Sequence, residues 1–356
     1  MSRNASIAAA RIAVAACSLI ATAAVPPPAA GEAREEARGY LQKVGFAAED
    51  LAALDAGQVI ARSETAKGTG EIVAIAAVKI RAPRDRTLAY YGEMVKFVDG
   101  KVTLAFGRFS TPPVAADVAG LAFDRGEVDD MKSCRPGDCD VRVGGAGLEA
   151  LRTAIDWSAT DYVEKVNQFV RESALRYVTA YQEKGDEALV TYNDSNKPVS
   201  LKQQWQAIVA NSPYFHVYAP ELKDYLERYP TAKLPGARDV FYWVKENYGA
   251  LKTVISIVHT VIYEPPSKPD WVLVAQKHIY ASHYYDASMA IASLLAAEEA
   301  GKPVTYLIYV NRSRGDLLKG GLGGVKRTVA KDQAKKAAEQ TLGAIQQVLE
   351  RAYAGR

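Results

Sequence analysis

Two cysteines in the segment MKSCRPGDCDVRV offer the most specific chemistry in this sequence. Cys134 and Cys139 are separated by the tetrapeptide Arg-Pro-Gly-Asp. Two thiolates are too few for a structural zinc ion, and their spacing is not the C-x-x-C of a redox pair. The Pro-Gly dipeptide favours a type II turn, which would bring the two cysteines within disulfide distance. We therefore predict a local disulfide between Cys134 and Cys139.

Three histidines raise the question of a metal site or a general base. His259, His278 and His283 lie on or beside predicted strands. A hairpin that pairs Tyr263 with Trp271 would place His259 and His278 on opposite faces of a sheet. No H-E-x-x-H or comparable spacing supports a metal, so we expect satisfied or surface histidines and no metal site. A role as general base stays open as an alternative.

Two further motifs lack the context that their chemistry requires. Ser256, Ser282 and Ser288 are not part of a G-x-S-x-G sequence, which a serine hydrolase of the α/β type would show. The glycines of residues 320–324 lack the Gly-Lys-Ser/Thr ending of a phosphate-binding loop. We interpret this loop as a hinge before a helix.

The N-terminus predicts export. Two arginines precede an apolar run over residues 12–24, which is about half the ~20 residues needed to cross a bilayer. We predict a signal peptide over residues 1–23 and a polar tether over residues 24–38. Cleavage removes Cys17, and the even cysteine count that is left favours a disulfide in an exported chain. Lipidation at Cys17 is the alternative, although the apolar run continues past it. We expect a periplasmic or secreted protein.

The composition is that of a globular protein, with 49% hydrophobic and 24% charged residues. A formal net charge of +3 is too small to indicate a nucleic-acid partner. Nothing in the sequence points to a cofactor.

The apolar periodicity predicts strands followed by a helical block, an antiparallel meander and a long terminal helix. The predicted strands cover residues 58–62, 72–80, 102–109, 253–263, 271–280, 284–295 and 304–310. The predicted helices cover residues 39–54, 84–97 and 325–352, together with a mostly helical block over residues 147–229.

Two stretches carry a resemblance to a known superfamily. They are EIVAIAAVKIRAPRDRTLAYYGEMVKF (71–97) and the last strand with its helix, which begins TYLIYVNRSRGDLLKGG. In this order they resemble the helix-grip fold of the START and polyketide-cyclase superfamily. The resemblance implies an α+β fold in which a curved antiparallel sheet grips a long C-terminal helix, with an apolar cavity between them. Residues 39–356 would form this domain, with a helical insertion at about 147–229. The whole chain also resembles exported bacterial proteins, a likeness that implies no activity.

Tyrosines are the most conspicuous candidates for a ligand cavity. The chain has 20 tyrosines and 8 phenylalanines, and several tyrosines fall in the meander. A tyrosine has an apolar body and a polar tip, which suits an amphipathic ligand and equally suits core packing. Arg312 lies in NRSRGD, which could bind an anion or form an internal ion pair. The candidate ligand-binding residues are Tyr280, Tyr284, Tyr306, His259, His278 and Arg312.

These features predict an exported binding protein for an apolar or amphipathic small molecule, such as a lipid, in a cavity between sheet and terminal helix. The alternatives are a hydrolase or other enzyme that uses the same cavity, and a structural protein of the envelope. The lysine-rich start of the terminal helix indicates transient contact with an anionic membrane surface, or a solvated face.

Overall fold

The computed structural model describes residues 30–43, 45–66, 70–89, 102–247, 252–315 and 323–354. The predicted signal peptide and the start of the tether lie outside these ranges. Residues 84–89 are helical as predicted, and the remainder of the helix predicted over 84–97 lies outside the described residues. Within the described ranges, no helix has the length and apolar character that a membrane crossing requires.

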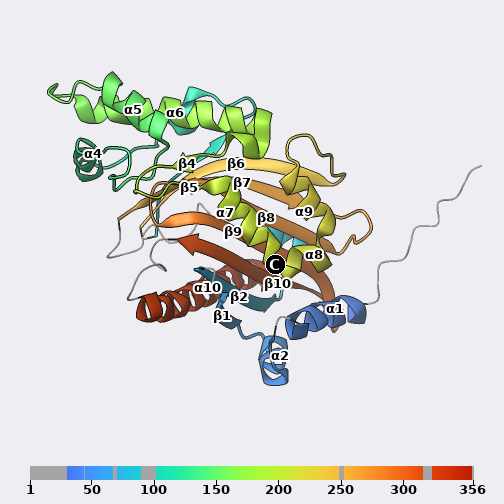
Figure 1. Cartoon of the computed structure of the whole chain (residues 1–356). Coiled ribbons are helices and arrows are strands. Elements are labelled where there is room, and N and C mark those ends of the chain that lie inside the picture. The colour runs from blue at the N-terminus through green and yellow to red at the C-terminus, as the bar shows by residue number, and fades with distance from the viewer. Residues whose placement is uncertain are drawn as a thin grey trace, which may run out of the picture.

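A curved, open antiparallel sheet forms the centre of the molecule (Figure 1). Its spatial order is β1-β2-β10-β9-β8-β7-β6-β3. The strands are β1 (Ile60–Ala66), β2 (Glu71–Ile80), β3 (Thr103–Phe109), β6 (Ala237–Glu246), β7 (Val254–Tyr263), β8 (Trp271–Ala281), β9 (Tyr285–Glu299) and β10 (Lys302–Gly315). The predicted meander is confirmed as β7 to β10, and its first partner, β6, was not predicted from the sequence.

The long terminal helix α10 (Gly323–Ala354) packs along β1 and β2 on one face of the sheet. In the part of the helix whose side chains are described, the buried stripe consists of Ala338, Leu342, Ile345 and Leu349. This stripe contacts apolar side chains that alternate along the strands, such as Val78 and Leu307, because every second residue of a strand points to the same face. The α+β fold with a sheet that grips its terminal helix is therefore confirmed.

Several short helices cover the opposite face of the sheet. They are α1 (Ala30–Lys43), α2 (Ala48–Asp55), α7 (Leu201–Ala210), α8 (Pro213–Tyr218) and α9 (Pro220–Glu227). In Figure 1, α7, α8 and α9 cross in front of the strands.

The tether prediction is wrong for residues 30–38, which belong to helix α1. The segment is rich in alanine, glutamate and arginine, which are good helix formers. Ala37 and Leu41, four residues apart, are fully buried against the main core. Arg34 and Arg38 both pair with Asp55 of α2, which holds the two helices together.

A second group of helices covers the β3–β6 end of the sheet, as the predicted helical insertion requires. It contains α4 (Arg125–Met131), α5 (Gly145–Ala154) and α6 (Tyr162–Lys184), with the short elements η1 (Ala115–Val118), η2 (Gly185–Ala188), β4 (Thr191–Tyr192) and β5 (Val199–Ser200). Their core centres on Phe241 and Trp243 of β6, which pack against Val166 and Val178 of α6. The helical insertion predicted at about 147–229 is therefore present, and it is divided between this group (α5 and α6) and the helices α7, α8 and α9.

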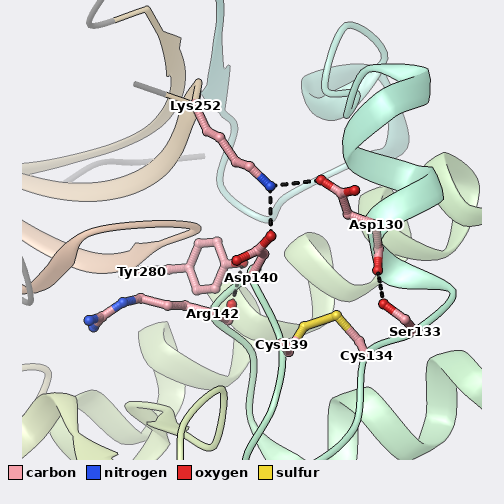
Figure 2. Close-up of a disulfide and its surroundings, with 8 residues drawn as sticks. All are labelled: Asp130, Ser133, Cys134, Cys139, Asp140, Arg142, Lys252 and Tyr280. Carbon is pink, nitrogen blue, oxygen red and sulfur yellow. Dashed lines mark hydrogen bonds and ion pairs between the residues drawn. A yellow bond between two sulfur atoms is a disulfide. The ribbon is translucent and has the colours of Figure 1, made fainter. Parts of the chain in front are cut away.

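The predicted disulfide is present between Cys134 and Cys139, whose Cα atoms are 4.5 Å apart (Figure 2). Gly137 has φ +88°, as the third position of a type II turn requires. Lys252, shortly before β7, donates to Asp130 at 2.7 Å and to Asp140 at 2.8 Å. This lysine ties both sides of the disulfide corner to the sheet.

Candidate ligand-binding site

A cleft of about 340 Å³ opens on the face of the sheet that carries the short helices, opposite the face covered by α10. We call this face the helical face of the sheet. It lies where β1, β2 and β10 adjoin α1 and the start of α8. Its lining residues are Tyr40, Lys43, Gly45, Arg62, Glu64, Val73, Ile75, Pro213, Val310 and Arg312. The cleft therefore combines an apolar surface with several charged side chains.

The strand register determines the floor of the cleft. Residues that pair directly across neighbouring strands share one face of a sheet. Two such rows cross the three strands: Arg62, Ile75 and Val310, and beside them Glu64, Val73 and Arg312. The apolar residues occupy the middle, and charges occupy the edge strand and one end of β10. A flexible apolar group could lie on this floor with a polar group beside Arg312.

The walls come from α1 and the turn that follows it. The ring of Tyr40 meets Tyr218 edge to face at 4.7 Å, and Lys43 Nζ lies 5.6 Å from the centre of the Tyr218 ring. Gly45 has φ +90°, and a Cβ atom there would come within 1.9 Å of Nη1 of Arg62. The positive φ favours glycine, and a larger residue would also displace the Arg62 guanidinium from its place in the cleft.

A buried ion pair lies beside the floor. Glu71 is fully buried. Its Oε1 accepts a hydrogen bond from Arg312 Nε at 2.6 Å, and its Oε2 lies 3.5 Å from Arg314 Nη1. The Arg312 side chain is only 8% exposed. Neither Nη1 nor Nη2 of Arg312 hydrogen-bonds to any part of the chain that the structure describes. Arg312 thus has unused hydrogen-bond donors at a position that lines the cleft.

Of the predicted ligand-binding residues, only Arg312 lines this cleft. Tyr306 points to the same face of β10 but lies six residues away, and its side chain is buried in the main core.

Tyr280 and Tyr284 use their hydroxyl groups to fix neighbouring backbone. The Tyr280 hydroxyl donates to the carbonyl of Arg142 at 2.9 Å, as Figure 2 shows. The Tyr284 hydroxyl accepts from the amide of Lys252 at 2.8 Å. Tyr284 also has φ +61°, which is uncommon for a bulky residue. Both tyrosines thus brace the loops around the disulfide corner, away from the cleft.

His259 belongs to a polar network in the core. Its Nε2 lies 2.7 Å from Asp239 Oδ1 and its Nδ1 lies 3.2 Å from the Tyr181 hydroxyl. Its ring stacks on Phe241, with centres 4.5 Å apart. Burial lowers the pKa of His259, and Asp239 opposes this effect. Because the side chain is wholly buried, the network as it stands leaves no room for a substrate at this histidine.

The other two histidines lie elsewhere. His278 pairs with Val258 and so points to the face opposite His259, as predicted. The observed register pairs Tyr263 with Leu273 and, from Val258 to Tyr263, differs from the predicted one by two residues, a shift that leaves these side chains on their faces. His283 lies in the loop after β8, and its Nε2 is 3.9 Å from Glu127 Oε1. No group of three or more metal-binding side chains occurs in the described ranges.

The other cleft residues have weak signals in the sequence. Arg62 ends a predicted strand that continues to Ala66, so the alternation of Arg62 with Glu64 on one face was not recognised. Tyr40 and Lys43 are three residues apart on a helix, which is a common arrangement with no functional signature. Glu71 could have been noted as an acidic residue at the start of a continuous apolar strand.

Comparison with known proteins adds no family: no family model matches the chain, and no curated protein matches it significantly.

Proposed function

We propose that this protein binds an apolar or amphipathic small molecule, such as a lipid, in the cleft between β1, β2, β10, α1 and α8. The observation that supports the proposal is the floor of Val73, Ile75 and Val310, which is bordered by charged side chains. A volume of about 340 Å³ is within the range of small-molecule sites. The mixture of apolar floor and charged rim suits a ligand with both characters.

The proposed site lies on the helical face of the sheet. In the described part of the interface with α10, Leu342 and Ile345 are buried among strand side chains and form a packed core. For this reason we place the ligand in the cleft and not beneath the terminal helix. The binding function itself is the one expected from the sequence.

Export is part of the proposal. A disulfide persists in oxidising compartments such as the periplasm, and the bond between Cys134 and Cys139 supports such a location. Contact with an anionic membrane surface stays a prediction. Among the lysines involved, Lys335 lies 3.6 Å from Glu339 and Lys336 is exposed on α10.

A matched pair of proline variants tests the site. Pro213 at the rim of the cleft and Pro220 outside it are both exposed and both occupy the first turn of a helix. Pro213→Trp would fill the cleft with an indole ring, whereas Pro220→Trp leaves the cleft open. We expect a fluorescent fatty acid to bind the wild type and Pro220→Trp alike, and to bind Pro213→Trp at least tenfold more weakly. If the probe does not bind the folded wild type at micromolar concentration, the proposed function is wrong.

A further inference from the structure

We propose that the ligand is a single-chain amphipathic anion whose carboxylate or phosphate head group binds Arg312. This inference rests on the proposed function, because it assigns a chemical class to the ligand of the same cleft.

Arg312 is held in a fixed orientation with part of its hydrogen-bonding capacity unused. The Nε of this guanidinium donates a hydrogen bond to Glu71 at 2.6 Å, and this bond orients the planar group. Arg312 lines the cleft, and its terminal nitrogens Nη1 and Nη2 have no hydrogen-bond partner among the described residues. A guanidinium presents its donors in a rigid fork that matches a carboxylate or phosphate. A nearly buried arginine with this unused fork points to an anion.

The charges around the cleft are not balanced. Among the described residues, the lining and its ion pair contain four cationic side chains, Lys43, Arg62, Arg312 and Arg314. Against them stand two carboxylates, Glu64 and Glu71. Within this described set, positive charges outnumber negative ones by two in a partly buried setting, where interactions between charges are stronger than in water. An anionic head group would balance part of this excess.

The register also orients the ligand. Val73 pairs with Arg312, and the adjacent row contains Ile75 and Val310. A head group at Arg312 would thus place an alkyl chain over the apolar middle of the floor, with Tyr40 as a wall. The same short stretch of sheet binds both ends of the molecule.

The experiment compares three probes of equal chain length on the full chain: dodecanoate, dodecyl phosphate and dodecanol. Displacement of a fluorescent fatty acid gives the affinity of each. We expect at least one anion to bind the wild type tenfold or more tightly than dodecanol, and the order of the two anions identifies the head group. If dodecanol binds as tightly as both anions, the inference is wrong while the proposed function stands. If no probe binds, the proposed function itself fails.

Charge variants locate the head group. Arg312→Gln should remove the preference for the anion over dodecanol and leave the affinity for dodecanol within about twofold. Because this change leaves Glu71 less well paired, Lys43→Gln provides a second variant at an exposed position of the lining. It should reduce the preference severalfold. Lys302→Gln, an exposed lysine outside the cleft, is the control and should leave the preference unchanged. An anion preference that survives in both cleft variants would overturn the assignment.

Discussion

Glu71 and Arg312 form a buried ion pair between β2 and β10, with Oε1 and Nε 2.6 Å apart. The direct cross-strand partner of Glu71 is Arg314, so Arg312 reaches it diagonally along the strand. The pair joins the N-terminal hairpin to the meander at the edge of the cleft.

The first prediction concerns this pair. Glu71→Ala would leave a nearly buried arginine without its main partner, and such a loss costs about 3–5 kcal/mol. Urea unfolding should show a decrease of that size in the free energy of unfolding. Glu64→Ala, which removes a half-exposed carboxylate from the neighbouring strand, should cost less than about 1 kcal/mol. Equal losses in the two variants would contradict a structural role for Glu71.

A second prediction concerns pH and His278. Burial lowers the pKa of His278 to about 4, whereas the pKa of an unfolded histidine is about 6.5. Between these values the unfolded chain binds a proton that the folded protein does not. The free energy of unfolding should therefore decrease as the pH falls from about 6.5 to 4, by up to about 3 kcal/mol, and this contribution should be constant above pH 6.5.

Unfolding measurements at several pH values check this dependence. His278→Gln removes the titrating group, so its free energy of unfolding should decrease less over the same pH range. His216→Gln alters an exposed histidine on α8 and should retain the wild-type slope. If the slope of His278→Gln equals that of the wild type, His278 is not the responsible group.

The fold could be predicted in outline because its elements have strong local patterns. The strands β7 to β10 are long and apolar, and α10 repeats apolar residues at helical spacing, so both are evident from periodicity. The strand β6 was missed because its first residues, such as Arg238 and Asp239, are exposed and polar. Residues 30–38 are polar, which favours a tether, but their alanine, glutamate and arginine content favours the helix that the structure shows.

The site could not be predicted in the same way, because it depends on contacts between distant segments. Glu71 and Arg312 are 241 residues apart in the chain, and only the pairing of β2 with β10 brings them together. Arg312 was identified as a candidate from its sequence context, with an anion or an ion pair as alternatives. The structure shows the ion pair with Glu71. Binding of an anion by the unused terminal nitrogens of Arg312 stays a proposal.

A third prediction tests the packing of the terminal helix. Leu342 is 1% exposed within the core between α10 and the sheet. Leu342→Asp would bring an unpaired charge into this core and should lower the free energy of unfolding by about 3–5 kcal/mol. Lys335→Glu, on the outer part of the same helix, replaces an i,i+4 ion pair with Glu339 by two like charges and should cost about 1 kcal/mol or less. If the two variants are equally stable in urea, the helix does not pack as described.

The last prediction concerns the disulfide corner, where two restraints act on one segment. The ring closed by Cys134 and Cys139 is short, so replacing both cysteines by serine should cost only about 2 kcal/mol. The ion pairs of Lys252 with Asp130 and Asp140 span the same corner and remain in that variant. We therefore expect the corner to stay folded without its disulfide.

The rate of hydrogen exchange at the backbone amide of residue 139 reports whether the corner stays folded. In the native protein this amide donates to the carbonyl of Asp194 at 2.9 Å. In the double serine variant this amide should stay protected. Adding Lys252→Met removes the second restraint and should lower the protection by an order of magnitude or more, whereas adding Lys302→Met should not. Loss of protection in the double serine variant alone would show that the lysine does not hold the corner. Stoichiometric alkylation of both cysteines in the native protein without reductant would show that the disulfide is absent.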